Sequence, residues 1–94
     1  MSESDHALRR QDAVRSLGVT LRALRRGKGL SQEQVAYAAQ LSVYSYGCLE
    51  RGRAPSGGIA NPTMDTLLRV FTALDIELPR LPDDRPPARI GDRL

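Results

Sequence analysis

The chain has 94 residues and a net charge of +3, with a pI near 9.6, so it suffices for one small domain whose basic character is compatible with a nucleic-acid partner. A single cysteine excludes an internal disulfide and a cysteine-based zinc site, and with one histidine we expect neither a metal ion nor a cofactor. No apolar run approaches the roughly 20 residues that span a bilayer, and no signal-type segment is present, so a cytoplasmic protein with no membrane partner is expected.

The first predicted helix covers residues 17–26, and the sequence leaves two alternatives for what precedes it. Residues 1–16 form either a frayed basic arm, which is slightly favoured, or a helical extension that begins at about Asp5. An extension would leave Leu8 and Val14 exposed beyond the domain, where they would invite a protein partner.

Glycines interrupt this first helical pattern at two places. Gly18 is predicted to weaken the helix, because glycine costs about 1 kcal/mol relative to alanine at a helix interior. The run Gly27-Lys28-Gly29 is predicted to end it, because glycine adopts a left-handed backbone at little cost.

The stretch LSQEQVAYAAQLSVYSYGCLERG, residues 30–52, carries two helix-start signals eleven residues apart. Ser31 and Gln34 have the spacing of a capping box, and the Ser42 hydroxyl can cap a second helix. Only Gln40-Leu41 separates the two segments. Two short helices joined so tightly must cross at a steep angle, which is helix-turn-helix geometry, and the outer face of the second helix is free to meet a partner.

The chain after this stretch contains one more predicted helix. Residues 53–62, rich in glycine and proline, form a loop, and Thr63 caps a helix over residues 64–74 with an apolar face. Phe71 is expected at the centre of the core. The proline-rich, charged tail at residues 79–94 is expected to be disordered unless a partner supplies a surface, and its prolines disfavour a fifth helix.

Several motifs occur together in a fixed order over residues 17–78. They are the run S-Q-E-x-V-A at residues 31–36, the turn exit Leu41-Ser42, the close Leu49-Glu50-Arg51-Gly52, and the downstream Asn61-Pro62-Thr63. This set resembles the Cro/C1-type (xenobiotic-response-element, phage-repressor) family of bacterial DNA-binding proteins. The resemblance implies an all-α fold: a compact domain of four to five helices over residues 17–78, with the helix-turn-helix at residues 31–51.

The resemblance also implies a role for individual residues. The second helix of the motif would lie in a major groove, with base edges contacted by Val43, Tyr44, Gly47 and Cys48. Contacts to phosphates, or bracing of the reading helix, would come from Gln32, Ser42, Arg51, Arg53 and Asn61. Arg25 and Glu50 would form an ion pair that fixes the orientation of the helices more than it stabilises them.

The predicted reading face is unusual, because it lacks the Arg, Asn and Gln side chains that form bidentate bonds to bases. Gly47 either lets the backbone approach DNA closely or is merely tolerated in a short helix, and the 53–62 loop is either functional or a neutral insertion. Tyr46 is predicted to pack in the core. Residues 17–60 hold six basic and two acidic side chains, so phosphate contacts and DNA shape are expected to contribute much of the affinity.

These observations predict a small prokaryotic transcriptional regulator that binds double-stranded DNA as a homodimer and is not an enzyme. No carboxylate pair, nucleophile–base pair or phosphate-cradling loop is evident in the sequence. The alternative is a protein-interaction module or an antitoxin, which would bind a partner protein as well as DNA, through the tail or the N-terminal helix.

Overall fold

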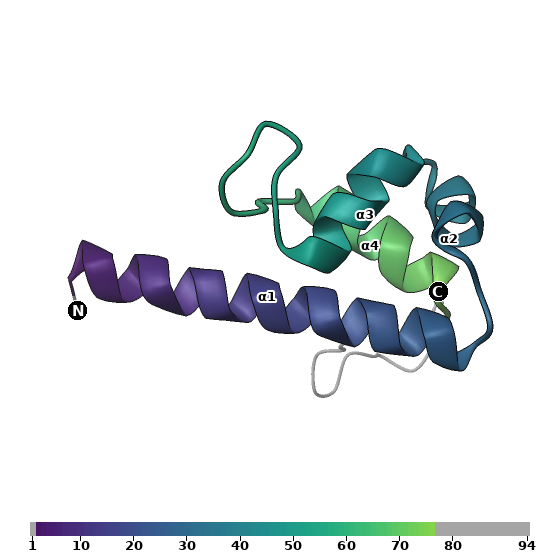
Figure 1. Ribbon diagram of the computed structural model, residues 1–94, viewed down its shortest axis with the longest axis horizontal. Coiled ribbons are helices and arrows are strands. Elements are labelled where there is room, and N and C mark those ends of the chain that lie inside the picture. The colour runs from purple at the N-terminus through teal and green to yellow at the C-terminus, as the bar shows by residue number, and fades with distance from the viewer. Residues whose placement is uncertain (1, 77–94) are drawn as a thin grey trace, which may run out of the picture.

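The computed structural model describes residues 2–76 and contains four helices in that range (Figure 1). They are α1 (Glu3–Gly27), α2 (Gln32–Ala39), α3 (Val43–Arg51) and α4 (Met64–Ala73). The all-α fold is therefore confirmed, while the predicted disorder of residues 79–94 concerns a segment outside the described residues. No helix within residues 2–76 combines the length and the apolar character that crossing a membrane requires.

Helix α1 is continuous through the residues that were expected, by a small margin, to form a frayed arm. Its first turn is capped, since the Ser2 hydroxyl accepts a hydrogen bond from the Asp5 backbone N–H at 3.2 Å. Glu3 and Asp5 place negative charge at the positive end of the helix dipole. The extension leaves Leu8 exposed, as predicted for it, but Val14 is partly covered. Figure 1 shows α1 running past the other helices toward the N-terminus.

Gly18 is not a weak point of α1 but the place where α1 meets α3. The residue is buried, and a Cβ atom at this position would lie 2.5 Å from the Glu50 carbonyl oxygen and 2.7 Å from that of Leu49. Both are backbone atoms, which cannot move aside cheaply. The missing side chain therefore lets the two helices approach at backbone distance, which outweighs the cost of glycine in helix propensity.

Local capping forms the helix-turn-helix as the sequence predicts. Ser31 and Gln34 form both bonds of the capping box, and the Ser42 hydroxyl accepts from the Ser45 N–H at 3.0 Å. Between the helices, Gln40 adopts the left-handed conformation (φ 60°, ψ 42°), which is favoured by glycine and uncommon for other residues. The Leu41 N–H then donates to the Ala36 carbonyl at 2.8 Å, which turns the chain from α2 into α3.

The core lies where α2 packs against both α3 and α4 and where α1 packs against α3 (Figure 1). Its largest fully buried side chains are those of Leu21, Val35, Tyr46, Val70 and Leu74. The prediction that Tyr46 belongs to the core is confirmed. Phe71 is only partly buried at the edge of this cluster, so its expected central position is wrong: Val70 and Leu74, one helical turn apart, present the buried face of α4 instead.

We predict that Gly18→Ala destabilises the protein by roughly 1–3 kcal/mol or more, although alanine favours helix formation, because the added methyl group overlaps backbone atoms of α3. Gly27→Ala is the matched control, since no atom lies within 4 Å of its added Cβ, and it should be neutral or stabilising by up to about 1 kcal/mol. Urea unfolding followed by circular dichroism measures both. Equal stability of the two variants would contradict the assignment of Gly18 as the helix-crossing point.

Candidate nucleic-acid interface

Arg25 and Glu50 hold α1, α2 and α3 in one arrangement. The Arg25 guanidinium donates to Glu50 through Nε (2.6 Å to Oε2) and Nη2 (3.1 Å to Oε1), and through Nη1 to the Leu30 carbonyl (2.8 Å). Gln32 Nε2 donates to the same Glu50 Oε1 at 2.9 Å. The side chains of Arg25 and Glu50 are only 10% and 2% exposed. One carboxylate thus receives donors from two helices, which fixes the orientation of α3.

The environment of Glu50 favours its charged form. Burial by itself raises the pKa of this carboxyl, but the polar groups around it, Arg25 first among them, outweigh burial, so the pKa lies below the ordinary value of a glutamic acid. Burial, together with the Glu50 carboxylate, raises the pKa of the neighbouring Tyr46, which therefore stays neutral. Within residues 2–76 the Tyr46 hydroxyl has no hydrogen-bond partner of good geometry.

The N-terminal turn of α3 is the part of the predicted reading face that is open to solvent. Val43 is 43% exposed and Tyr44 is 61% exposed, on a turn capped by Ser42. The Tyr44 hydroxyl also donates to the Pro55 carbonyl at 3.4 Å, which is a long hydrogen bond. The exposed face therefore offers an aliphatic side chain and a phenol, next to the loop that follows α3.

Gly47 lies beneath side chains rather than at the open surface. A Cβ at this position would be 3.1 Å from Arg51 Nη1 and 3.7 Å from Gln32 Oε1. The absence of a side chain makes room for these two polar groups. This favours neither of the alternatives that the sequence left open: the residue accommodates the phosphate-contact candidates Arg51 and Gln32 and does not itself face outward.

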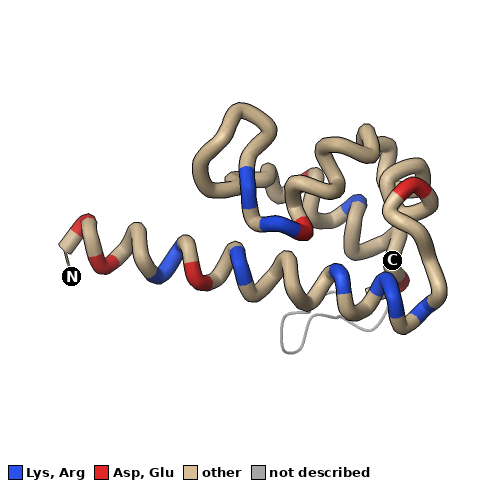
Figure 2. Tube along the Cα trace, viewed as in Figure 1, with Lys and Arg blue, Asp and Glu red and all other residues tan. Residues whose placement is uncertain are grey.

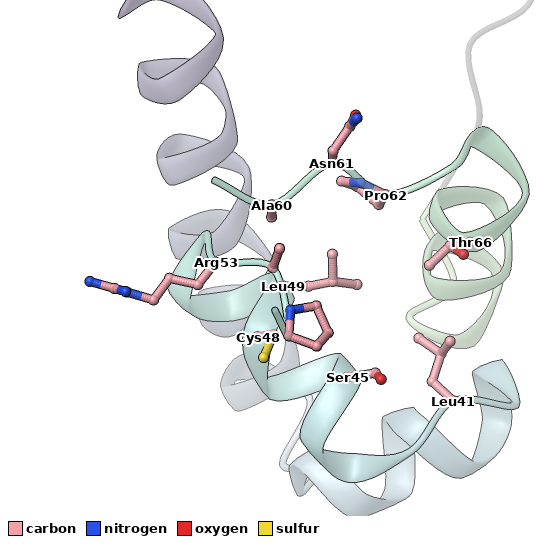
Figure 3. A pocket seen from close by; sticks show the side chains of 11 residues that line it. Leu41, Ser45, Cys48, Leu49, Arg53, Ala60, Asn61, Pro62 and Thr66 are labelled. Atoms are coloured by element: carbon pink, nitrogen blue, oxygen red, sulfur yellow. The ribbon is translucent and has the colours of Figure 1, made fainter. Parts of the chain in front are cut away.

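Cys48 is buried, with 3% of its surface exposed, so a contact between its thiol and a base does not fit this structure. The thiol lines a mainly apolar cavity of about 250 Å³ between α3, α4 and the loop, together with Leu49, Ala54, Pro55 and Pro62 (Figure 3). The physical reason is the long loop, which folds over this part of α3. The Cys48 thiol is also contacted by Arg51 Nη2 at 3.5 Å.

The loop at residues 53–62 is held by backbone hydrogen bonds and is not an irregular insertion. Arg53 and Ile59 form an isolated antiparallel β-bridge, and the Ala54 N–H donates to the Gly58 carbonyl at 3.1 Å. Gly57 and Gly58, both at positive φ, make the turn between them. The loop projects beside α3 in Figure 1. It carries two of the predicted phosphate-contacting residues, Arg53 and Asn61, both exposed.

Basic residues gather where the end of α3 and the start of the loop lie next to α1, as the blue segments in Figure 2 show. Arg51 is the last residue of α3, and Arg53 is the first residue of the loop. Both line a hollow beside α1, and Arg15 of α1 lines the same hollow. Arg15 was not among the residues that the sequence indicated. Arg15 reaches this hollow because residues 3–16 are helical. The apolar spacing that suggested a helical extension was the only feature of the sequence that could have indicated this position.

Comparison with known proteins places these features in a family. Residues 16–81 match a family described as "Helix-turn-helix domain". Among solved structures, the chain is similar to the restriction-modification controller protein C.AhdI from Aeromonas hydrophila, with 38% identity and a TM-score of 0.60 over 70% of this chain and 91% of that one. The comparison with curated proteins gave no match.

We predict that Glu50→Gln lowers the free energy of unfolding by roughly 3–5 kcal/mol, because it leaves the Arg25 charge buried without a counter-charge. The double variant Arg25→Met, Glu50→Leu removes both charges and should be destabilised much less. Thermal and urea unfolding of both variants measure this. A double variant as unstable as Glu50→Gln would show that the pair contributes net stability, contrary to this account.

Acidification is predicted to destabilise the protein through the same carboxylate. Because the pKa of Glu50 is lower in the folded than in the unfolded chain, its contribution is complete at neutral pH and is lost as the pH falls below about 4.3, the ordinary glutamate value, toward the folded pKa. The unfolding free energy of Glu50→Gln should therefore fall less steeply below pH 5 than that of the wild type. Glu33→Gln, at an exposed position, is the control and should follow the wild-type profile. Parallel profiles for all three proteins would contradict the assignment.

Proposed function

Because the chain belongs to the Cro/C1-type helix-turn-helix family of DNA-binding regulators, we propose that it binds double-stranded DNA sequence-specifically, with the N-terminal half of α3 in the major groove. The observation that carries this proposal is that one end of α3 is held in place by hydrogen bonds while the other end is exposed to solvent. Glu50, near its end, is clamped by Arg25 and Gln32, while Val43 and Tyr44, at its start, are exposed.

In this proposal the base contacts come from the first turn of α3. Val43 offers methyl groups to the thymine methyl, and the Tyr44 hydroxyl can donate to or accept from one base edge. Neither side chain forms a bidentate bond. The discrimination between bases therefore has a smaller direct component than in readers that use Arg or Asn, and DNA shape supplies the remainder.

Phosphate contacts flank this turn in the proposed complex. Ser42 and the N-terminus of α2 present oriented backbone amides, and the exposed Arg51, Arg53 and Asn61 provide side-chain donors. Gln32 already donates its side-chain amide to Glu50, so we assign it to bracing α3. These contacts set the position of the protein on the duplex and make the affinity salt-dependent.

We further propose that the protein binds as a homodimer and regulates transcription of restriction-modification genes. The similarity to a restriction-modification controller protein, which extends over most of that protein, supports the regulatory role. A two-fold dimer would read half-sites about one helical turn, roughly 34 Å, apart. The DNA upstream of the chain's own gene is the natural first probe, and a pseudo-palindrome protected there from cleavage would identify the site.

Tyr44→Ala is predicted to weaken binding to that site by roughly 2- to 12-fold, corresponding to the about 0.5–1.5 kcal/mol of a single hydrogen bond, with little change in affinity for a random duplex. Titrations by fluorescence anisotropy at several salt concentrations measure both. Tyr37→Ala is the matched control, because Tyr37 is 87% exposed on α2. Tyr44→Phe separates the hydroxyl from the ring.

Two results would contradict the proposal. One is an equal reduction in affinity for Tyr44→Ala and Tyr37→Ala, which would place the base-contacting surface elsewhere. The other is an absence of salt-sensitive binding by the wild-type protein to any duplex pool at low ionic strength, which would remove DNA binding itself and favour the protein-interaction alternative.

A further inference from the structure

We propose that the N-terminal half of α1 completes a phosphate-binding site, in which Arg15 acts together with Arg51 and Arg53. The three side chains line a hollow of about 230 Å³ between α1, the end of α3 and the loop at residues 53–62. Gln11, one turn before Arg15 on α1, adds a neutral amide to the same wall.

The geometry of two helix contacts brings these arginines together. Gly52 ends α3 in the left-handed conformation (φ 72°), and a Cβ there would lie 3.5 Å from the Arg15 Cα and 3.6 Å from Val14 Cγ1. The end of α3 thus rests directly on α1. Gly18, one turn further along α1, makes the second contact. Arg15 is consequently held on the side of α1 that faces the residues on either side of Gly52.

The charge of the hollow is not balanced by nearby carboxylates. Within residues 2–76 the ion pairs are Arg25–Glu50 and Arg69–Asp65, so none of the three arginines lies within 4 Å of a carboxylate oxygen in that part of the chain. Glu50, the acidic residue next to Arg51 in the chain, is turned inward to Arg25. Three residues of the same charge line one hollow, and an anion bound there reduces the repulsion between them.

The chemistry of the lining selects phosphate as the ligand. Guanidinium groups present planar N–H forks that match phosphate oxygens, and the Gln11 amide adds a further donor. The source is either a phosphodiester of bound DNA or a free phosphate group. With DNA as the source, the inference rests on the proposed function and extends it: the helix N-terminal to the usual domain becomes part of the DNA interface. The competing explanation is that the arginines only stabilise the negative end of the α3 dipole.

The test uses the full chain with Arg15→Gln and a matched control, Arg22→Gln, an exposed arginine of the same helix outside the hollow. With DNA as the source, Arg15→Gln lowers the slope of log K against log salt by about 0.9 for each phosphate that the variant no longer neutralises, equally for specific and random duplexes, while Arg22→Gln keeps the wild-type slope. Urea unfolding of both variants provides the readout for a purely structural role.

A second arm titrates inorganic phosphate into ¹⁵N-labelled protein and follows the arginine Nε–Hε signals. Saturable shifts of Arg15, Arg51 and Arg53 that disappear in Arg15→Gln support the site, with a free phosphate group as the source if the salt slope is unchanged. An unchanged slope together with no shift overturns the proposal, and so does a lowered unfolding midpoint of Arg15→Gln as its only effect. If the wild type binds no DNA, the proposed function fails. The phosphate titration alone then tests whether the hollow binds phosphate.

Discussion

The arrangement of this protein depends on the buried contact between Arg25 and Glu50. It joins three helices through one carboxylate, and its charges are withdrawn from water at a cost that the ion pair and the accompanying hydrogen bonds largely offset. Such a contact adds little net stability compared with apolar residues of the same volume. What it adds is a defined orientation, because a guanidinium fork donates to both oxygens of a carboxylate in only a few orientations. For a helix whose exposed first turn carries the proposed reading residues, orientation is the property that matters.

Two glycines lie where α1 and α3 meet beside that contact. At Gly18 the backbones of α1 and α3 approach at a distance that excludes any side chain, and at Gly52 the end of α3 rests on α1 one turn earlier. A small core alone would leave the angle between these helices loosely determined. Two contacts between α1 and α3, with the ion pair beside them, determine it. Because α1 continues past the end of α3, Arg15 lies next to Gly52 and lines the same hollow as Arg51 and Arg53.

The sequence predicted best what short-range chemistry determines. The caps at Ser31 and Ser42 require only a hydroxyl at the right spacing, and both helices begin there. The long-range features were harder. Cys48 was expected at the reading face because the family resemblance placed it there, but the structure buries its thiol beside the loop that follows α3. In the sequence, Gly18 only lowers the helix propensity of α1. Its structural role depends on a contact with α3, and no local pattern identifies a contact between residues more than thirty positions apart.

In the proposed complex, the positions of the side chains determine which residues contact bases and which contact phosphates. The first turn of α3 offers Val43 and Tyr44, which make few hydrogen bonds, while three arginines lie at the opposite end of the helix and on α1. Contacts to phosphates carry no sequence information directly, but they hold the duplex in one position and one curvature. A weak direct readout then becomes selective, because only sequences that adopt that curvature at low cost retain every contact. On this reasoning, the phosphate contacts of α1 add affinity for specific and random duplexes alike and hold the duplex where Val43 and Tyr44 meet the bases.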